Sequence, residues 1–149
     1  MSNNYYLTKE AHKKTGLEIG TTAHIVPFKG EATVIYDYKG LMELMYRSGH
    51  VKSIPFKAVY ENDVFEVMEG TERFIRHIPS RSDRGKLVAA YAIANFKDGG
   101  FDFEVVYPVD IEATKKIAPG SRSKDSPWNK PDQEWTMWCK TAVRRLAKR

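Results

Sequence analysis

The sequence predicts an α+β fold in which antiparallel β-hairpins are interrupted by a few helices. Short runs rich in β-branched and aromatic residues are bounded by turn-forming residues, as in hairpins. Other segments repeat their apolar residues at helical spacing. A hydrophobic fraction of 42% supports a real core, and 149 residues fit one domain, which we expect over residues 21–149 behind a polar extension at 1–20.

The first elements follow from short-range signals. Thr22–Phe28 and Ala32–Tyr38 flank the turn residues KGE at 29–31, so these two segments should form a hairpin. Apolar residues then recur at helical spacing within Lys39–Arg47, and the Ser-Gly pair at 48–49 supplies a stop signal. The sequence therefore predicts a short helix directly after the hairpin.

The middle of the chain is typical of strands. Val51–Asn62 predicts one long strand with an irregularity at Pro55, and Val64–Met68 should pair back onto it through the turn at 61–63. Arg73–Ile78 is a further strand candidate. The remaining elements are, in order, the hairpin of Lys86–Lys97 and Phe101–Tyr107, a helix at Asp110–Ile117 just after Pro108, a loop at 119–131, and a final helix that begins at Asp132 or Gln133.

Composition and motifs exclude several classes of protein. No apolar run approaches the length of a transmembrane helix, and the first residues lack an apolar signal core, so neither a membrane partner nor export is expected. A single cysteine, Cys139, excludes an internal disulfide and suits a reducing cytoplasm. The sequence has no GxxxxGK[ST], HExxH or CxxC, so neither an ATPase nor a zinc site is indicated.

Positive charge is concentrated in two segments. The net charge of the chain is +5. Residues 71–86 and residues 132–149 each contain five basic and two acidic residues, so together they carry +6 and the remainder is slightly acidic. Clustered positive charge is the electrostatic footprint of proteins that bind nucleic acids.

The closing stretch WTMWCKTAVRRLAKR, residues 135–149, is amphipathic. On a helix of about 100° per residue, one face carries the apolar residues Trp135, Cys139, Ala142, Val143 and Leu146. The opposite side carries the basic stripe of Lys140, Arg144 and Lys148, beside Arg145 and Arg149. Trp138 lies between these arginines, and it either packs against a neighbouring element or forms a stacking and phosphate-binding platform with them. We interpret Cys139 as a small core residue and not as a nucleophile.

The other basic segment, RFIRHIPSRSDRGK at 73–86, alternates basic and apolar residues before it becomes a loop. On a strand, Arg76 would share a face with Phe74 and Ile78. The mobile tip of the loop would carry Arg81, Arg84 and Lys86. This segment is equally compatible with an ordinary surface hairpin and with a finger over a nucleic-acid groove.

An acidic cluster offers an alternative function from another class. Glu61, Asp63, Glu66 and Glu69 could hold a divalent cation, as in a metal-dependent nuclease, or could merely solvate the end of a hairpin. A further alternative is a protein-interaction module without DNA activity, in which the basic face meets an acidic partner.

Several segments are informative when they are taken together and in order. They are AHIVPF at 23–28, DYKGLMELMYRSGHVKSI at 37–54, VYENDVFEVMEG at 59–70, RHIPSRSDRGKLVAAYAIANFKDGGFDFEVV at 76–106 and SPWNKPDQEWTMWCKTAVRRLAKR at 126–149. Over residues 20–149, this series resembles the core region of the phage RecT-type (RecT/Redβ) single-strand annealing recombinases. DYKG stands where that family has GYRG.

The resemblance implies a non-catalytic, ATP-independent protein that binds single-stranded DNA and anneals complementary strands in homologous recombination. It also implies a curved antiparallel sheet backed by helices, similar to the core of the eukaryotic single-strand annealing proteins. Expected partners are single-stranded DNA, the annealed duplex intermediate, further copies of the chain in a ring or helical filament, and a phage exonuclease or host single-strand-binding protein. No cofactor is expected beyond a loosely bound Mg²⁺, and the expected location is the cytoplasm of a bacterial host cell.

The residues expected to contact DNA come from the two basic segments and from positions that match the family. Within the basic segments they are Arg76, Arg81, Arg84, Lys86, Trp138, Lys140, Arg144, Arg145 and Lys148. Lys39 and Arg47 match basic positions of the family in the first helix. Trp128 is either an anchor in the core or a further stacking residue.

Overall fold

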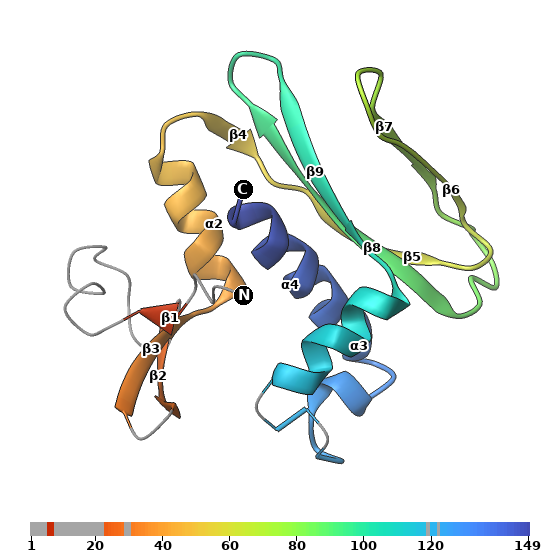
Figure 1. Ribbon diagram of the computed structural model, residues 1–149. Coiled ribbons are helices and arrows are strands. Elements are labelled where there is room, and N and C mark those ends of the chain that lie inside the picture. The colour runs from red at the N-terminus through yellow and green to blue at the C-terminus, as the bar shows by residue number, and fades with distance from the viewer. Residues whose placement is uncertain (1–5, 8–22, 29–30, 119, 122) are drawn as a thin grey trace. The chain divides into compact units, whose positions relative to one another are not determined.

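The computed structural model of the protein describes residues 6–7, 23–28, 31–118, 120–121 and 123–149 (Figure 1). Contacts divide the chain into two units that are interleaved in sequence. Unit 1 comprises Met1–Pro55, Ile93–Phe103 and Val143–Arg149, and unit 2 comprises Phe56–Ala92 and Glu104–Ala142. The long strand β8 (Leu87–Phe96) and the last helix α4 (Glu134–Ala147) each contribute residues to both units.

In unit 1, the hairpin expected near residue 30 is present. β2 (Ala23–Phe28) and β3 (Glu31–Tyr36) are antiparallel, with Ile25 opposite Val34, and β1 (Tyr6–Leu7) pairs with the other edge of β3. Their β-branched residues suit a pleated strand. This part of the prediction is confirmed.

Helix α2 (Tyr38–Arg47) follows the hairpin at once and has a defined cap at each end. The Asp37 carboxylate accepts a hydrogen bond from the Tyr38 backbone N–H at 2.7 Å. At the other end, the Ser48 hydroxyl donates to the Met45 carbonyl at 2.6 Å, and Gly49 has a φ of 83°, which favours glycine. The predicted helix is therefore confirmed, with its stop signal at residues 48–49.

The rest of unit 1 is built around the end of β8. β4 (Val51–Ser53) pairs antiparallel with Asn95 and Phe96 of β8. β9 (Phe101–Val106) pairs with β8 as well, and the turn at 97–100 that connects them is closed by a hydrogen bond from the Phe96 N–H to the Gly100 carbonyl at 2.8 Å. The predicted hairpin with DGG in its turn is therefore present.

The long strand expected at 51–62 is divided at the irregularity predicted for Pro55. β4 ends at Ser53 and β5 (Phe56–Tyr60) begins after the proline. Pro55 has no N–H to donate to a ladder, but its carbonyl accepts a hydrogen bond from the Ile93 N–H at 2.9 Å. The interruption coincides with the boundary between the two units.

In unit 2, β5 pairs antiparallel with the first part of β8, with Phe56 opposite Ala92. Small side chains dominate the centre of this unit. Those that are fully shielded from solvent are Val59, Ala89, Ala90, Ala92, Val106, Cys139 and Ala142. Alanines on β8 leave room for the first half of α4 to approach the strands closely. The pKa values of Tyr60 and Tyr91 are raised mainly by burial, and Cys139 of that helix is near enough to both to add a smaller contribution.

The strand β6 (Val64–Met68) pairs with β7 (Phe74–Ile78) and does not pair back onto β5, so that prediction was wrong. The turn at residues 60–63 explains why. The Asp63 carboxylate accepts the Tyr60 N–H at 3.0 Å, and the Asp63 N–H donates to the Tyr60 carbonyl at 3.0 Å. A hairpin could keep the second of these bonds, but it would need the Tyr60 N–H for a backbone carbonyl of the returning strand, and the Asp63 side chain occupies that N–H.

The remaining helices of the described chain are α3 (Pro108–Ile117), the 3₁₀ turn η1 (Pro127–Asn129) and α4. α3 begins two residues earlier than expected because Pro108 occupies the first turn, where a missing N–H breaks no helical hydrogen bond. In η1, Trp128 is 5% exposed. Of the two alternatives for Trp128, the structure supports the core anchor.

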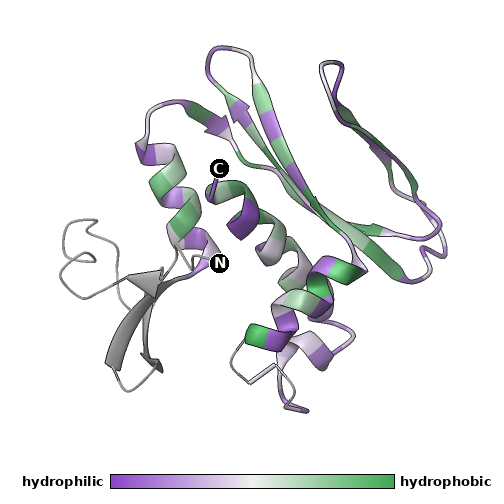
Figure 2. Cartoon of the chain, in the orientation of Figure 1, coloured by the Kyte–Doolittle hydropathy of each residue, from purple (hydrophilic) through white to green (hydrophobic). Residues whose placement is uncertain are grey.

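The fold class is α+β, as predicted, with open antiparallel sheets and helices. Figure 2 shows hydrophilic residues at the tips of the β6–β7 and β8–β9 hairpins, as expected for turns in water. Among the described residues, no helix has the length and apolar character needed to cross a membrane.

Candidate nucleic-acid interface

Unit 2 contains an open groove of about 670 Å³ beside β5 and β8. Its lining comes from β5, β7, β8, the segment at 79–84 and the first turn of α4. The lining residues are Phe56, Lys57, Ala58, Tyr60, His77, Pro79, Arg84, Tyr91 and Trp135. Aromatic rings dominate this surface, and Lys57 and Arg84 supply its positive charges.

The structure reverses the expected positions of two tryptophans in α4. Trp135 is 41% exposed and lines the groove, whereas Trp138 is 5% exposed. Trp138 is four residues before Ala142, so the two side chains lie about 40° apart around the helix, and Ala142 is fully buried. Trp135 lies on the first turn, where the helix borders the groove. Trp138 is therefore buried, which favours the packing alternative over the stacking platform.

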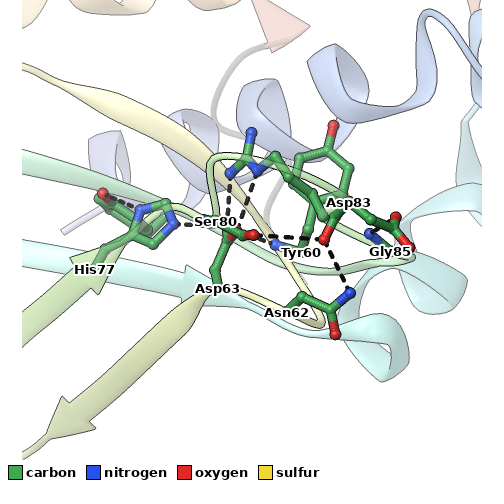
Figure 3. Close-up of polar contacts among 9 residues, drawn as sticks. Tyr60, Asn62, Asp63, His77, Ser80, Asp83 and Gly85 are labelled. Atoms are coloured by element: carbon green, nitrogen blue, oxygen red, sulfur yellow. Dashed lines mark hydrogen bonds and ion pairs between the residues drawn. The ribbon is translucent and has the colours of Figure 1, made fainter.

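One wall of the groove is held by a buried carboxylate, that of Asp63 (Figure 3). Arg84 donates to it twice, from Nε to Oδ1 at 3.1 Å and from Nη2 to Oδ2 at 2.6 Å. The Ser80 N–H donates to Oδ1 at 2.9 Å. The side chain of Asp63 is 0% exposed, and these hydrogen bonds, that of Arg84 first, hold its pKa well below the usual range against the effect of burial.

His77 extends this network toward β8. Its Nε2 lies 2.9 Å from Asp63 Oδ2, and its Nδ1 lies 2.9 Å from the hydroxyl of Tyr91. Because the ionised carboxylate can only accept, Nε2 carries the proton, and in the neutral ring Nδ1 accepts from the tyrosine. Burial raises the pKa of Tyr91, so its hydroxyl stays protonated and able to donate. Phe65 stacks on Tyr91 with ring centroids 5.8 Å apart.

The loop at 79–86 is tied to the turn at 61–63 by further hydrogen bonds. The Asn62 side-chain amide donates to the Asp83 carbonyl at 3.0 Å. The Lys86 N–H donates to Glu61 Oε1 at 3.0 Å, and the Glu61 N–H donates to the Lys86 carbonyl at 2.8 Å. Gly85 has a φ of 78°, and any Cβ there would collide with the Glu61 side chain. The loop therefore has a fixed base.

A model of the RecT family matches residues 12–149 of this chain. The chain belongs to the RecT family. Protein RecT of Escherichia coli (strain K12) is 32% identical over 144 residues, which cover 89% of this chain and 52% of that protein. This RecT-family chain therefore spans about half the length of the curated relative that it matches, and the resemblance expected from its motifs is confirmed.

The three basic residues predicted for the loop of this RecT-family chain have different environments. The Arg84 guanidinium is bound to Asp63 and lies over the Tyr60 ring, with Cζ 4.3 Å from the ring centroid. It therefore does not belong to a mobile tip, and its charge is compensated. Arg81 and Lys86 are exposed.

The acidic cluster of the RecT-family chain serves the loop and the hairpin. Asp63 is buried against Arg84, and Glu61 accepts from Lys86. Glu66 faces Arg76 across the β6–β7 hairpin, with a nitrogen-to-oxygen distance of 3.6 Å between two exposed side chains. In the part of the chain that the structure describes, no three histidine, cysteine, aspartate or glutamate residues are grouped so that they could hold a metal ion.

The other predicted contact residues lie on α2 and α4. Lys140, Arg144 and Arg145 on α4, and Lys148 directly after its end, are partly buried. Burial, together with Arg145 and Arg144, lowers the pKa of Lys148. On α2, Lys39 is exposed, and Arg47 forms an ion pair with Glu43 at 2.6 Å. Cys139 is fully buried, which raises the pKa of its thiol to about 12, so it is not a nucleophile at neutral pH.

The sequence did not point to His77 or Trp135 as site residues, and it offered Asp63 only as a member of the acidic cluster of a metal-dependent nuclease. Asp63 and Arg84 are 21 residues apart, so no local period relates them. The signal that could have found the network is the coincidence of a lone histidine, an Arg-Gly pair and an aspartate in a turn, all within two segments that resemble the family.

Proposed function

We propose that this chain binds single-stranded DNA and anneals complementary strands without a nucleotide cofactor, as a non-catalytic protein of homologous recombination. The observation that carries the proposal is the groove of unit 2, which combines aromatic side chains with positive charge in a chain of the RecT family. Proteins that bind single strands without sequence preference use this combination.

In this mechanism the protein offsets the repulsion between two strands. Lysine and arginine side chains bind the phosphates of one strand and release its counterions. The exposed residues Arg81 and Lys86 on the anchored loop, and Lys57 at the groove, are the first choices for this role. The bound strand keeps its base edges available, and a complement is then selected by base pairing.

A second set of contacts is proposed on the helices. The basic residues Lys140, Arg144 and Arg145 of α4, and Lys148 directly after it, would contact phosphates beyond the groove. Lys39 and Arg47 on α2 and Arg76 on β7 are secondary candidates. Because Arg76 and Arg47 already face Glu66 and Glu43, DNA would have to compete with these surface ion pairs, which contribute little in water.

Assembly and partners are also proposals. Annealing of long strands requires many copies side by side, as a ring or a helical filament. A phage exonuclease would supply the single strand, or a host single-strand-binding protein would hand it over, in the cytoplasm of a bacterial cell. A loosely bound Mg²⁺ would only screen phosphates.

The decisive experiment mixes two complementary fluorescent oligonucleotides with the protein, without nucleotide, at rising salt. Faster annealing than in the protein-free control, fading as salt rises, is the expected result. If the chain neither binds nor anneals single strands at low salt, the proposal is wrong and a protein-interaction module becomes the better interpretation. A denaturing gel of the same DNA with Mg²⁺ tests the nuclease alternative, because a nuclease would shorten the strands.

A further inference from the structure

We infer that the groove of unit 2 is a nucleobase subsite, in which the indole ring of Trp135 provides the stacking face for a base of the bound strand. This inference rests on the proposed binding of single-stranded DNA, and it adds the class of group that the groove accepts. Phosphates would be held by Lys57, the exposed cation among the lining residues, and by Arg81 and Lys86 on the loop outside the groove.

The charges of the groove favour a neutral ring over a phosphate. Arg84 is the most deeply placed cation, and both of its hydrogen-bonded nitrogens face the ionised Asp63 carboxylate. Burial is the main cause of the raised pKa of Tyr60; Arg84 opposes it, and the carboxylates of Asp63 and Glu134 add smaller contributions of negative potential near this ring. Lys57 alone, among the described lining residues, is a cation without a compensating carboxylate. A dianionic or monoanionic phosphate would therefore gain little inside the groove.

The lining of the groove suits a flat aromatic group. Trp135 on one side is 41% exposed, and Phe56 and Tyr60 are half-buried. Ala58 and Tyr91, both buried, form a floor of low polarity. Aromatic rings prefer offset or edge contacts with one another, and a base can make such contacts with an exposed indole.

Arg84 is already in position to donate a hydrogen bond to such a base. Its guanidinium lies over the Tyr60 ring and is fixed by the two hydrogen bonds to Asp63, so it loses little freedom when a base binds. Within the described part of the chain, its third nitrogen, Nη1, makes no hydrogen bond. That nitrogen can donate to a carbonyl or ring-nitrogen acceptor, which all four bases carry.

Trp135 can be tested selectively because the other two tryptophans, Trp128 and Trp138, are each 5% exposed. Acrylamide should therefore quench mainly the fluorescence of Trp135. Binding of oligo(dT) should protect this fluorescence, whereas a strand of the same length made of abasic residues should not. Trp135→Phe provides the baseline, since its remaining fluorescence comes only from the buried tryptophans.

Affinities of the same two strands complete the test. Trp135→Ala should weaken binding of oligo(dT) by roughly five- to one-hundred-fold and leave binding of the abasic strand unchanged. Trp135→Phe keeps a ring and should lose much less. Val109→Ala on α3, which removes part of a 75% exposed apolar side chain in the same unit, serves as the matched control and should change neither affinity.

The outcomes separate this inference from the proposed function. If Trp135→Ala binds and anneals like the wild type, or loses affinity for both strands equally, the nucleobase subsite is wrong while DNA binding stands. If the wild type binds neither strand, both proposals fail together. Thermal unfolding of each variant shows whether the exposed site was changed without loss of the fold.

Discussion

The carboxylate of Asp63 and the guanidinium of Arg84 are joined by two hydrogen bonds of 2.6 and 3.1 Å, although the residues are 21 positions apart. One partner closes the turn after β5, and the other lies at the end of the loop that leads into β8. The pair therefore fastens the loop at 79–86 to the strand that lines the groove. The stability of the groove wall and the placement of the loop cations should depend on it.

Replacement of Asp63 by Asn should destabilise the chain. The carboxylate is fully buried and Arg84 is 36% exposed, so we expect a loss of about 2–3 kcal/mol, below the roughly 3–5 kcal/mol typical of a wholly buried pair. Urea unfolding at pH 7 measures this loss. Glu66→Gln, which removes one carboxylate of the exposed pair with Arg76, is the matched control and should stay within about 0.5 kcal/mol of the wild type.

The same carboxylate should make the protein sensitive to acid. The folded pKa of Asp63 lies below its unfolded value of about 3.9, so its contribution is complete above about pH 5 and is lost as the pH falls below 4. The free energy of unfolding of the wild type should therefore fall more steeply than that of Asp63→Asn between pH 5 and pH 3. Parallel slopes for the two proteins would contradict the assigned pKa direction.

Removal of the Tyr91 hydroxyl should lower the free energy of unfolding, because His77 connects this hydroxyl to Asp63. Tyr91→Phe leaves Nδ1 of His77 without its partner at 2.9 Å, in a side chain that is only 5% exposed, and should cost about 1–2 kcal/mol. Tyr60→Phe is the control, because its ring contact with Arg84 remains and its hydroxyl makes no hydrogen bond in the described structure. Thermal unfolding should separate the two variants, and equal midpoints would argue against the bridge.

The close approach at Gly85 should make this glycine less replaceable than another of similar backbone geometry. Gly85 and Gly99 have φ angles of 78° and 97°, so alanine is strained at both positions, by about 1–2 kcal/mol. Only at Gly85 would the new methyl group meet the Glu61 side chain and displace its hydrogen bond with Lys86. Gly85→Ala should therefore cost about 1–2 kcal/mol more than Gly99→Ala in chemical denaturation. A smaller loss of stability for Gly85→Ala than for Gly99→Ala would mean that the Glu61 side chain can move aside without disturbing the loop.

The loop cations should appear in the salt dependence of DNA binding. If Arg81 and Lys86 each neutralise one phosphate, the double replacement by alanine should reduce the slope of log affinity against log salt by about 1.4, since each contact contributes about 0.7 on single strands. Lys97→Ala combined with Lys116→Ala removes two other exposed cations and should change the slope less. Fluorescence anisotropy with oligo(dT) at several salt concentrations measures both, and an unchanged slope for the loop variant would remove the loop from the interface.

Local patterns in the sequence predicted most of the elements, because hairpins such as β8–β9 and caps such as those of α2 depend on residues a few positions apart. Strand pairing was less predictable. The partner of β6 was decided by the turn in which the Asp63 side chain binds the Tyr60 N–H, and hydrophobic alternation carries no information about such a side chain.

The candidate site shows the same limit. A helical wheel assigned an apolar face to α4 correctly, but it could not show that the groove lies at the first turn and that Trp135 would be exposed there instead of Trp138. The count of basic residues identified the loop, and the family resemblance identified the class of protein. Only the structure shows that the charge of Arg84 is neutralised, because this residue forms an ion pair with Asp63.

The interleaving of the two units bears on how the chain acquires its structure during synthesis. Unit 1 draws on Met1–Pro55, Ile93–Phe103 and Val143–Arg149, so no shorter uninterrupted piece of this sequence contains all of it. The lining of the groove ends at Trp135, within unit 2. On a ribosome, every residue that lines the groove is therefore synthesised before the last segment of unit 1.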